Sequence, residues 1–497
     1  MNKQLLRLSV VAMVLLAALI VSTTYWQSWA AADLQNRQDN QIAAVEQLSI
    51  NRGKIYAADG AVLATNTVSH KHGLTIFTRH YPQNDLAAEV IGYATAGEGR
   101  TGIESSLNDY LTGANTNLSG TLSQQLNRLG NQTVNGDSVV LTLKPALQRL
   151  ALSLLAGRCG AVVALDPRTG AVYAMASSPT YNQNLIIENR YGKILKIRGP
   201  CGDSSALVNN ATAGLYPPGS TFKLVTASAA LDSGAYTPNS TFYDPGYCTE
   251  YGQKVYNSSA PDSPTGHEVF GNVNFGQALE HSINAVFCNI GQHIGAAKIL
   301  EYAKRYGFYS LPAIDLPPSE SQASGLYNKG KLWFPKNPDN GSVDAGRLAF
   351  GQERMLATPL QMALVASTIA NGGVEPKPYL VQKIKAPNGS VVSSTAPQML
   401  GRVIKPQTAS ELNQMMQLVV QGGTGTTAQI PGVQVAGKTG TAELGLGSIY
   451  DGWFVCFAPA NNPRIAVAVV VEKQPNGFGG SVSAPIARAI LEKFLHG

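Results

Sequence analysis

A serine and a lysine three residues apart supply the first chemistry in this 497-residue chain. Ser220 follows Pro217-Pro218-Gly219, which cannot lie inside a helix, whereas residues 222–231 have good helix-forming sequence. Ser220 therefore stands at a helix start, among outward-pointing amides, and Lys223 lies one turn further on the same face. A serine nucleophile needs a base, and a lysine can serve when its pKa is lowered. The alternative is an ordinary capping serine beside a solvated lysine.

Two further segments supply groups that can hold a peptide. Ser282-Ile283-Asn284 presents a second hydroxyl and an amide that can bind a peptide backbone. Lys438-Thr439-Gly440-Thr441 leads into an apolar strand, and small residues on an edge strand let a substrate backbone lie alongside it. The lysine and the two threonine hydroxyls can hold a carboxylate. Each segment alone is also compatible with a helix cap or a turn, but the three in this order favour one site.

The elements that must position these residues follow from the apolar patterning. Residues 161–165 and 171–175 predict a hairpin, and residues 453–457 and 465–471 predict two further strands. We expect a last helix to begin near Ser483, with Pro485 in its first turn. A hairpin first, a helix-rich middle, and strands and a helix last predict an α+β domain whose two ends meet in one antiparallel sheet.

The region before this domain has a different texture. Residues 33–155 are polar and rich in Asn and Gln, with short strand-like runs at 61–63, 74–77 and 138–143. A helix is expected after Pro145, which suits a first turn. We expect a small, mixed, elongated module here rather than a dense core.

The N-terminus carries an export signal. Lys3 and Arg7 precede 19 uncharged residues, 8–26, whose helical length of about 28 Å matches the hydrocarbon core of a bilayer. The flanking cations predict a cytoplasmic N-terminus and an extracytoplasmic remainder. A cleaved signal peptide ending near residues 30–32 is the alternative, and it also exports the chain.

Composition excludes several classes. Hydrophobic residues make up 44% of the chain and charged residues 14%, which excludes both a disordered chain and a multi-span membrane protein. The net charge of +6 without a Lys/Arg-rich run argues against a nucleic-acid partner. The five cysteines fit no metal spacing. Cys201 with Cys248 is the best candidate pair, and Cys288 and Cys456, in apolar runs, are expected to be inert core thiols.

Together, S-x-x-K, S-x-N and K-T-G resemble the three motifs of the penicillin-recognising serine acyltransferases. The chain is most similar to the class B penicillin-binding proteins, which are peptidoglycan D,D-transpeptidases. Further segments carry the resemblance over most of residues 50–495, and they are Arg52-Gly53-Lys54-Ile55, Gly102-Ile103-Glu104, residues 160–184, Gly351-Gln352, residues 358–361 and residues 370–373.

The resemblance implies three parts. They are a cytoplasmic stub and single transmembrane anchor over residues 1–32, a dimerisation or pedestal module over 33–155, and a penicillin-binding transpeptidase domain over 156–497. The last part would have a central antiparallel sheet flanked by helices, plus a helical subdomain. The protein would sit in the cell membrane with its catalytic domain outside and serve wall synthesis in growth or division.

The resemblance also implies catalytic roles. Ser220 would attack the penultimate D-Ala carbonyl of a stem pentapeptide and release the terminal D-Ala. Lys223 would take its proton, helped by the positive potential of Lys438, and Ser282 would pass a proton to the leaving amine. The backbone amides of Ser220 and Thr441 would form the oxyanion hole, worth about 3 kcal/mol per donor. An amine of a neighbouring stem peptide would then resolve the acyl-enzyme.

Substrate binding is implied in the same way. Asn284 would bind the substrate amide, and the strand segment Lys438, Thr439, Gly440 and Thr441 would hold the terminal carboxylate, or that of a β-lactam antibiotic. The resemblance implies no metal and no cofactor. Glycan polymerisation would fall to a partner, a multi-span membrane glycosyltransferase.

Three other functions share some of these features. A β-lactamase needs a base aimed at a deacylating water, and the sequence offers no clear Glu-x-x-Leu-Asn segment for it. A D,D-carboxypeptidase would release D-Ala to water, and a residual activity of this kind is compatible with a transpeptidase. An antibiotic-sensing receptor would use acylation to signal inward, but a stub of about seven residues leaves it little machinery.

Overall fold

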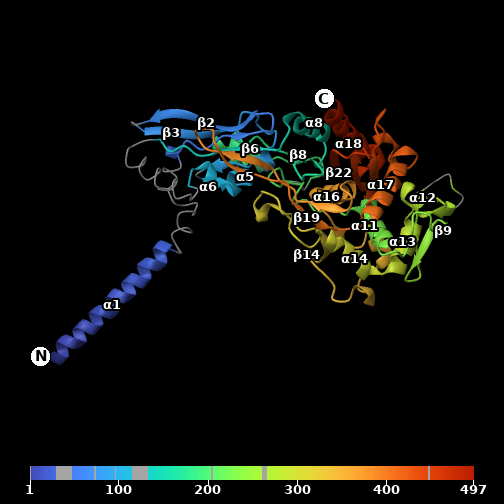
Figure 1. The fold of residues 1–497 in the computed structure, drawn as a ribbon, viewed down its shortest axis with the longest axis horizontal. Helices are drawn as coiled ribbons and strands as arrows, with labels where there is room; N and C mark the ends of the chain where they lie inside the picture. Colours follow the sequence, from blue (N-terminus) through green and yellow to red (C-terminus); the bar gives the residue numbers. More distant parts are fainter. Residues whose placement is uncertain are drawn as a thin grey trace.

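The structure is a computed structural model that describes residues 2–28, 48–71, 74–95, 97–114, 133–202, 205–259, 263, 266–445 and 448–497. The first helix, α1 (Asn2–Ser28), lies apart from the rest of the described chain (Figure 1). Within it, Arg7–Trp26 is long and apolar enough to cross a membrane, and none of its hydrophobic window is buried. The predicted apolar helix is therefore present.

The N-terminal module is built on a six-stranded sheet. Its strands, in spatial order, are β18 (Val391–Ser394), β17 (Val381–Lys385), β6 (Ser138–Leu141), β1 (Ile55–Tyr56), β2 (Val62–Lys71) and β3 (Leu74–His80). The predicted strands at 61–63, 74–77 and 138–143 are all found. β17 and β18 come from far along the chain, so the later region of the sequence completes the sheet of the earlier one (Figure 1).

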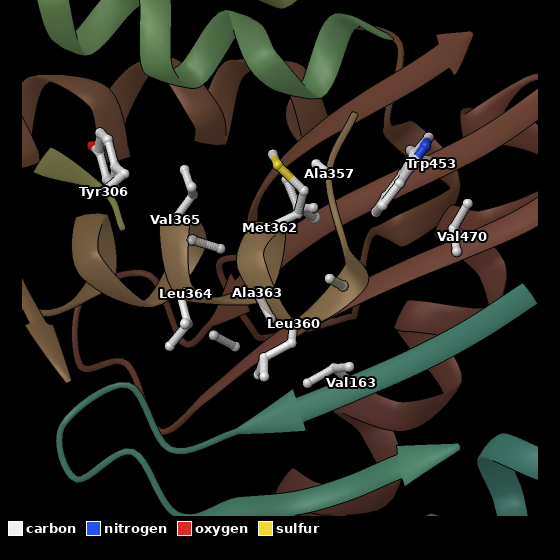
Figure 2. Close-up of a cluster of buried hydrophobic side chains, with 14 of the residues drawn as sticks. Val163, Tyr306, Ala357, Leu360, Met362, Ala363, Leu364, Val365, Trp453 and Val470 are labelled. Carbon is white, nitrogen blue, oxygen red and sulfur yellow. The ribbon is translucent and has the colours of Figure 1, made fainter. Parts of the chain in front are cut away.

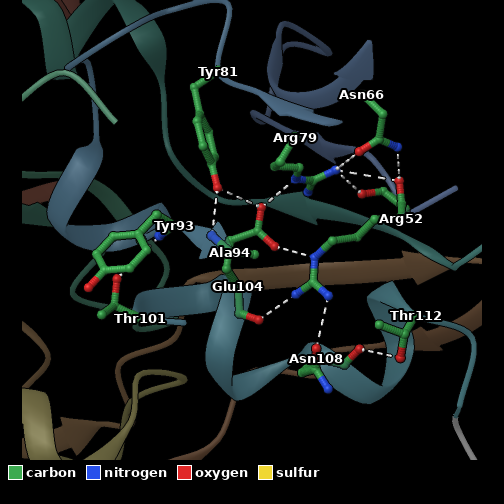
Figure 3. A network of polar contacts seen from close by, with 12 residues as sticks. Arg52, Asn66, Arg79, Tyr81, Tyr93, Ala94, Thr101, Glu104, Asn108 and Thr112 are labelled. Atoms are coloured by element: carbon green, nitrogen blue, oxygen red, sulfur yellow. Dashed lines mark hydrogen bonds and ion pairs between the residues drawn. The ribbon is translucent and has the colours of Figure 1, made fainter. Parts of the chain in front are cut away.

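A buried ionic network holds this module together. Glu104 lies in the short helix α5 (Gly102–Ser106) and is fully buried. Its carboxylate accepts hydrogen bonds from Arg52 Nε at 2.6 Å and from Arg79 Nε at 2.5 Å (Figure 3). Burial raises the pKa of Glu104, but the two guanidinium groups outweigh it and hold the pKa below its usual value. The module therefore has a denser interior than its polar sequence predicts.

The second sheet has five antiparallel strands. Their spatial order is β20 (Ala436–Glu443), β21 (Ile449–Ala458), β22 (Ile465–Pro475), β7 (Gly160–Leu165) and β8 (Val172–Ser178). The predicted hairpin is β7–β8, and the last strands of the domain pair with its first, with Val470 opposite Ala161. β20, which carries the Lys-Thr-Gly segment, lies at the edge of the sheet, as predicted.

Helices cover both faces of this sheet. On one face lies α16 (Pro359–Ala370), which is mostly apolar and buried along almost its whole length, as expected of a central core helix. Figure 2 shows its Leu360 and Met362 among Val163, Val470 and Trp453 of the sheet. On the other face lie α8 (Pro145–Leu155) and α18 (Gly479–His496), whose apolar residues form a separate cluster with the sheet.

The start of α18 differs from the prediction. The helix begins at Gly479, and Pro485 lies inside it rather than in its first turn. Gly479 and Gly480 let the helix start in close contact with β20 and its surroundings, because a Cβ on Gly479 would lie 2.3 Å from Gly440 O. The helix start is therefore fixed by tertiary contact, which the proline signal does not report.

The helix-rich middle of the domain forms a subdomain around the second motif. The subdomain opens with the 3₁₀ turn η1 (Gly219–Phe222). Its helices are α11 (Lys223–Asp232), α12 (Phe275–Glu280), α13 (Asn284–Ile294), α14 (Ala296–Arg305), α15 (Ala345–Ala349) and α17 (Pro406–Gln421). Small antiparallel pairs border it, namely β9 (Thr241–Asp244) with β12 (Gly271–Asn274), β10 (Tyr247–Glu250) with β11 (Gln253–Tyr256), and β13 (Gly325–Asn328) with β15 (Met355–Leu356). The observed α+β architecture is the predicted one.

The predicted pair of Cys201 with Cys248 is wrong, and so is the free thiol predicted at Cys288. The disulfides join Cys159 to Cys201 and Cys248 to Cys288, and only the buried Cys456 is the expected free core thiol. Cys159, just before β7, packs on the 199–201 segment, and Cys288 on α13 faces Cys248 on β10. Apolar surroundings made Cys288 resemble a core thiol, whereas the hairpin β10–β11 folds over α13 and supplies its partner.

Candidate active site

Ser220 stands where a tight turn becomes a helix. It lies in the 3₁₀ turn η1, which continues directly into α11, so the predicted helix start is confirmed. Gly219 has φ +50°, and a Cβ there would lie 2.8 Å from Thr441 O. Only a glycine therefore lets the turn lie this close to β20. Ser220 itself remains partly exposed.

Lys223 begins α11 and is fully buried behind Ser220. Its Nζ makes hydrogen bonds to Ser282 O at 2.6 Å, to Asn284 Oδ1 at 2.8 Å and to Ser282 Oγ at 3.2 Å. The same Nζ lies 5.1 Å from the centre of the Phe287 ring. The first and second motifs therefore meet at this nitrogen.

The second motif occupies a strained turn between two helices. Ser282 follows α12 and has φ +59°, a conformation that residues other than glycine rarely adopt. Asn284 is the first residue of α13. The turn is fixed from behind because the Ala285 amide donates to Asn257 Oδ1 at 2.9 Å. Both side chains of the motif thus point back to Lys223 and are held there by the surrounding loop.

The third motif brings a second buried lysine to the same hydroxyl. Lys438 is fully buried in β20, and its Nζ donates to Ser282 Oγ at 2.9 Å and to Thr439 O at 3.0 Å. Ser282 Oγ therefore lies between the two lysine nitrogens. The three motifs, which are far apart in the sequence, converge on one hydroxyl.

Gly440 allows the nucleophile turn to rest on the edge strand. A Cβ at this position would lie 2.8 Å from Pro218 O, 2.9 Å from Thr221 Cγ2 and 3.0 Å from Trp453 Cβ. The Trp453 indole Nε1 also donates to Pro217 O at 2.9 Å. The residues on either side of Ser220 are thus packed directly on β20 and β21.

The two threonines of the third motif have different surroundings. Thr441 is partly exposed, and its Oγ1 accepts from the Gly479 amide at 3.3 Å. Thr439 is only 6% exposed, and its Oγ1 lies 2.6 Å from Thr424 Oγ1. Thr424 was not among the residues predicted for the site. Its Gly-Gly-Thr-Gly-Thr context is typical of a loop, and only the fold brings it to the motif.

The electrostatics of the site favour a neutral Lys223. Burial, and then the charge of Lys438, lower the pKa of Lys223 well below its ordinary value, against an opposing effect of Glu268. Burial lowers the pKa of Lys438 to about 7. A neutral Lys223 has a lone pair and can accept a proton, so the arrangement suits general-base activation of a hydroxyl. Glu268, whose charge acts on this lysine, is a second residue that the sequence did not indicate.

Comparison with known proteins identifies the family that carries this arrangement. Residues 160–492 match the model of the penicillin-binding protein transpeptidase domain, and residues 52–139 match that of the penicillin-binding protein A dimerisation domain. The chain belongs to the penicillin-binding protein transpeptidase family. It is a class B penicillin-binding protein, in a family of peptidoglycan D,D-transpeptidases that are serine acyltransferases.

Relatives of this class B penicillin-binding protein match it from end to end. The chain is 33% identical to the peptidoglycan D,D-transpeptidase PbpA of Mycolicibacterium smegmatis, over 100% of this chain and 99% of that protein. The penicillin G acyl-enzyme complex of penicillin-binding protein A from M. tuberculosis has a TM-score of 0.77 at 30% identity, and the match covers 90% of this chain and 100% of that one. The D,D-transpeptidase domain of a peptidoglycan glycosyltransferase from Eggerthella lenta has a TM-score of 0.75 at 34% identity, covering 90% and 98%.

Proposed function

We propose that the protein cross-links peptidoglycan through an acyl-enzyme on Ser220, and that β-lactams acylate the same residue. The observation that carries the proposal is that Lys223, one helical turn after Ser220, and Lys438 both reach the hydroxyl of Ser282. In the first half-reaction the Ser220 hydroxyl attacks the penultimate D-Ala carbonyl of a stem peptide, and the terminal D-Ala leaves. In the second half-reaction an amine of a neighbouring stem peptide attacks the ester and restores Ser220.

Protons follow the hydrogen bonds at the back of the site. Lys223, with its pKa well below normal, takes the proton of Ser220 as the carbon–oxygen bond forms. Ser282 then relays a proton to the departing amine and recovers one from the lysines that flank its hydroxyl. The strained φ of Ser282 and the buried surroundings of both lysines support a pre-organised relay of this kind.

Substrate charge and amide groups are bound along β20 and at the start of α13. The Thr439 and Thr441 hydroxyls bind the terminal carboxylate, and the positive potential of Lys438 attracts it. Gly440 keeps the strand close to the nucleophile turn. Asn284 receives the substrate amide, and the Ser220 and Thr441 amides form the oxyanion hole. The close packing of Gly219 on Thr441 supports this last assignment.

We also propose the topology and the partner. The apolar helix Arg7–Trp26 spans the cell membrane once, with Lys3 and Arg7 on the cytoplasmic side and the catalytic domain outside. The dimerisation or pedestal module before the catalytic domain then stands next to the membrane. Glycan strands come from a multi-span membrane glycosyltransferase, which contacts the anchor and this module.

Labelling with a fluorescent penicillin tests the nucleophile. We expect the protein lacking residues 1–30 to take up one label and to keep it for hours, and we expect Ser220→Ala to take up none. A label lost within seconds would indicate a β-lactamase instead. A folded Ser220→Ala protein that labels like the wild type would reject Ser220.

A further inference from the structure

A fourth segment, outside the three motifs, reaches the carboxylate-binding strand. Residues 422–425 follow α17, and Thr424 Oγ1 lies 2.6 Å from Thr439 Oγ1. Thr424 is exposed, whereas Thr439 is 6% exposed. Of the two linked threonines, Thr424 is therefore the one that a ligand from solvent can reach more easily.

The backbone of this segment is closely packed on its neighbours, which fixes the point from which the Thr424 side chain extends. The Thr424 amide donates to Glu280 O at 3.3 Å, just before the second motif. A Cβ on Gly423 would lie 2.3 Å from the same Glu280 O, and a Cβ on Gly480 would lie 2.4 Å from Thr424 O. The segment is therefore packed backbone to backbone between the end of α12 and the start of α18. A side chain on such a support needs little ordering when a ligand binds.

The hydrogen bond between Thr424 and Thr439 can run in either direction, and its direction decides which hydroxyl keeps a proton for a ligand. Each threonine hydroxyl has one proton to donate, and a charged lysine can only donate. Lys438 Nζ lies 3.5 Å from Thr439 Oγ1 and donates toward it. If Thr439 in turn donates to Thr424, the remaining proton of the chain is that of Thr424, which faces solvent. A chain of donors that starts at a cation is polarised along its length, and it ends in a hydroxyl suited to an anion.

We propose that Thr424 is a further substrate-binding residue, which donates to the terminal carboxylate of the stem peptide as the outer end of the chain Lys438–Thr439–Thr424. The proposal rests on the proposed function, because the ligand is the carboxylate of that donor substrate. It adds to the third motif a hydroxyl from a different part of the sequence. In this arrangement the single proton of Thr439 goes to Thr424, so Thr439 acts on the carboxylate through Thr424, and the partly exposed Thr441 donates to it directly.

The test compares acylation by penicillin G with acylation by its methyl ester, which lacks the anionic carboxylate. The measured quantity is the second-order rate constant for acylation, followed by intact-protein mass. The loss of a hydrogen bond to a charged group changes a binding or rate constant by about tenfold or more. We therefore expect Thr424→Val to lower the rate constant for the free acid by at least about tenfold and that for the ester by less than about twofold. Thr424→Ser, which keeps the hydroxyl, should restore most of the rate with the free acid.

The same loop offers a matched control. Thr427 Oγ1 donates to Gly480 O instead of to Thr439, so Thr427→Val should leave the ratio of acid to ester rates unchanged. Thr439→Val should remove the benefit of Thr424, so that the double variant is about as slow as either single one. If Thr424→Val lowers the melting temperature, Thr424→Ala and Thr424→Ser give the same comparison.

Each outcome has one meaning. Equal slowing of acid and ester by Thr424→Val would assign Thr424 a purely structural role and overturn the proposal, as would no slowing at all. A wild-type protein that neither compound acylates would instead reject the proposed function. Acylation of the wild type with an unchanged Thr424→Val protein would reject only the role of Thr424.

Discussion

Replacing Gly440 with alanine should disable the site through a defined shift. A Cβ at Gly440 would lie 2.8 Å from Pro218 O, and ordinary van der Waals contact begins near 3.4 Å, so the carbonyl must move by about 0.6 Å. Thr221 Cγ2, at 2.9 Å, must move as well. These two residues flank Ser220, and the Trp453 indole that anchors Pro217 O leaves the turn little freedom. The displacement therefore falls on the nucleophile.

The expected size of the effect follows from the cost of overpacking. Inserting a methyl group into a well-packed site costs about 1–3 kcal/mol, and a shift of about half an ångström is enough to spoil a catalytic arrangement. We therefore expect Gly440→Ala to slow acylation by a fluorescent penicillin about tenfold to hundredfold, measured as a time course of labelled protein.

Gly437 provides the matched control on the same strand. A Cβ there would lie 2.6 Å from Phe454 Cζ and 3.2 Å from Cys456 Cβ, on the opposite side of β20 from Ser220. Gly437→Ala should lower the melting temperature without slowing acylation of the folded protein. If Gly440→Ala is acylated at a rate within twofold of the wild-type rate, and all of the protein becomes labelled, the nucleophile turn does not depend on this contact.

Three other outcomes test the scaffold and the electrostatics. Glu104→Gln leaves Arg52 and Arg79 without their buried carboxylate and should lower the free energy of unfolding by about 3–5 kcal/mol in urea titrations. Because the folded-state pKa of Glu104 is lowered, the wild type should lose this stabilisation only as the pH falls through that folded-state pKa. Replacing both Cys248 and Cys288 with serine opens a loop of 40 residues and should lower the free energy of unfolding by about 4 kcal/mol, and an unchanged urea midpoint would count against the disulfide. If the positive charge of Lys438 assists Lys223, the second-order rate of acylation should fall as the pH rises above about 7, and a flat profile between about pH 6 and 9 would contradict that assistance.

The sequence predicted well what local pattern determines. Runs such as Ile465–Val471 are rich in β-branched residues, so β22 and its neighbours were found. Their bounds were too short, because β22 continues to Pro475 and β21 already begins at Ile449. Ser220 at a helix start follows from proline and glycine chemistry, which also acts locally. The three motifs were assigned to one site from their order and family resemblance, and the structure brings them together at Ser282 Oγ.

The features that the sequence did not predict depend on tertiary approach. The pairing of Cys248 with Cys288 requires the hairpin β10–β11 to fold over α13, and spacing carries no such information. The start of α18 depends on how closely Gly479 approaches Gly440. Thr424 belongs to the site only because α17 delivers its loop to β20. The strands β17 and β18 join the N-terminal sheet from more than 200 residues away, which no local pattern indicates.

The central claim is that Ser220 transfers an acyl group to an amine. Its most direct test is to incubate the full chain, in detergent or bilayer discs, with glycan strands that carry pentapeptide stems, and to analyse the digested products by mass spectrometry. We expect cross-linked stem-peptide dimers and one released D-Ala per cross-link, both lost in Ser220→Ala. Release of D-Ala with only uncrosslinked tetrapeptides would show transfer to water and contradict the transpeptidase assignment. Cross-links that persist in Ser220→Ala would contradict the nucleophile.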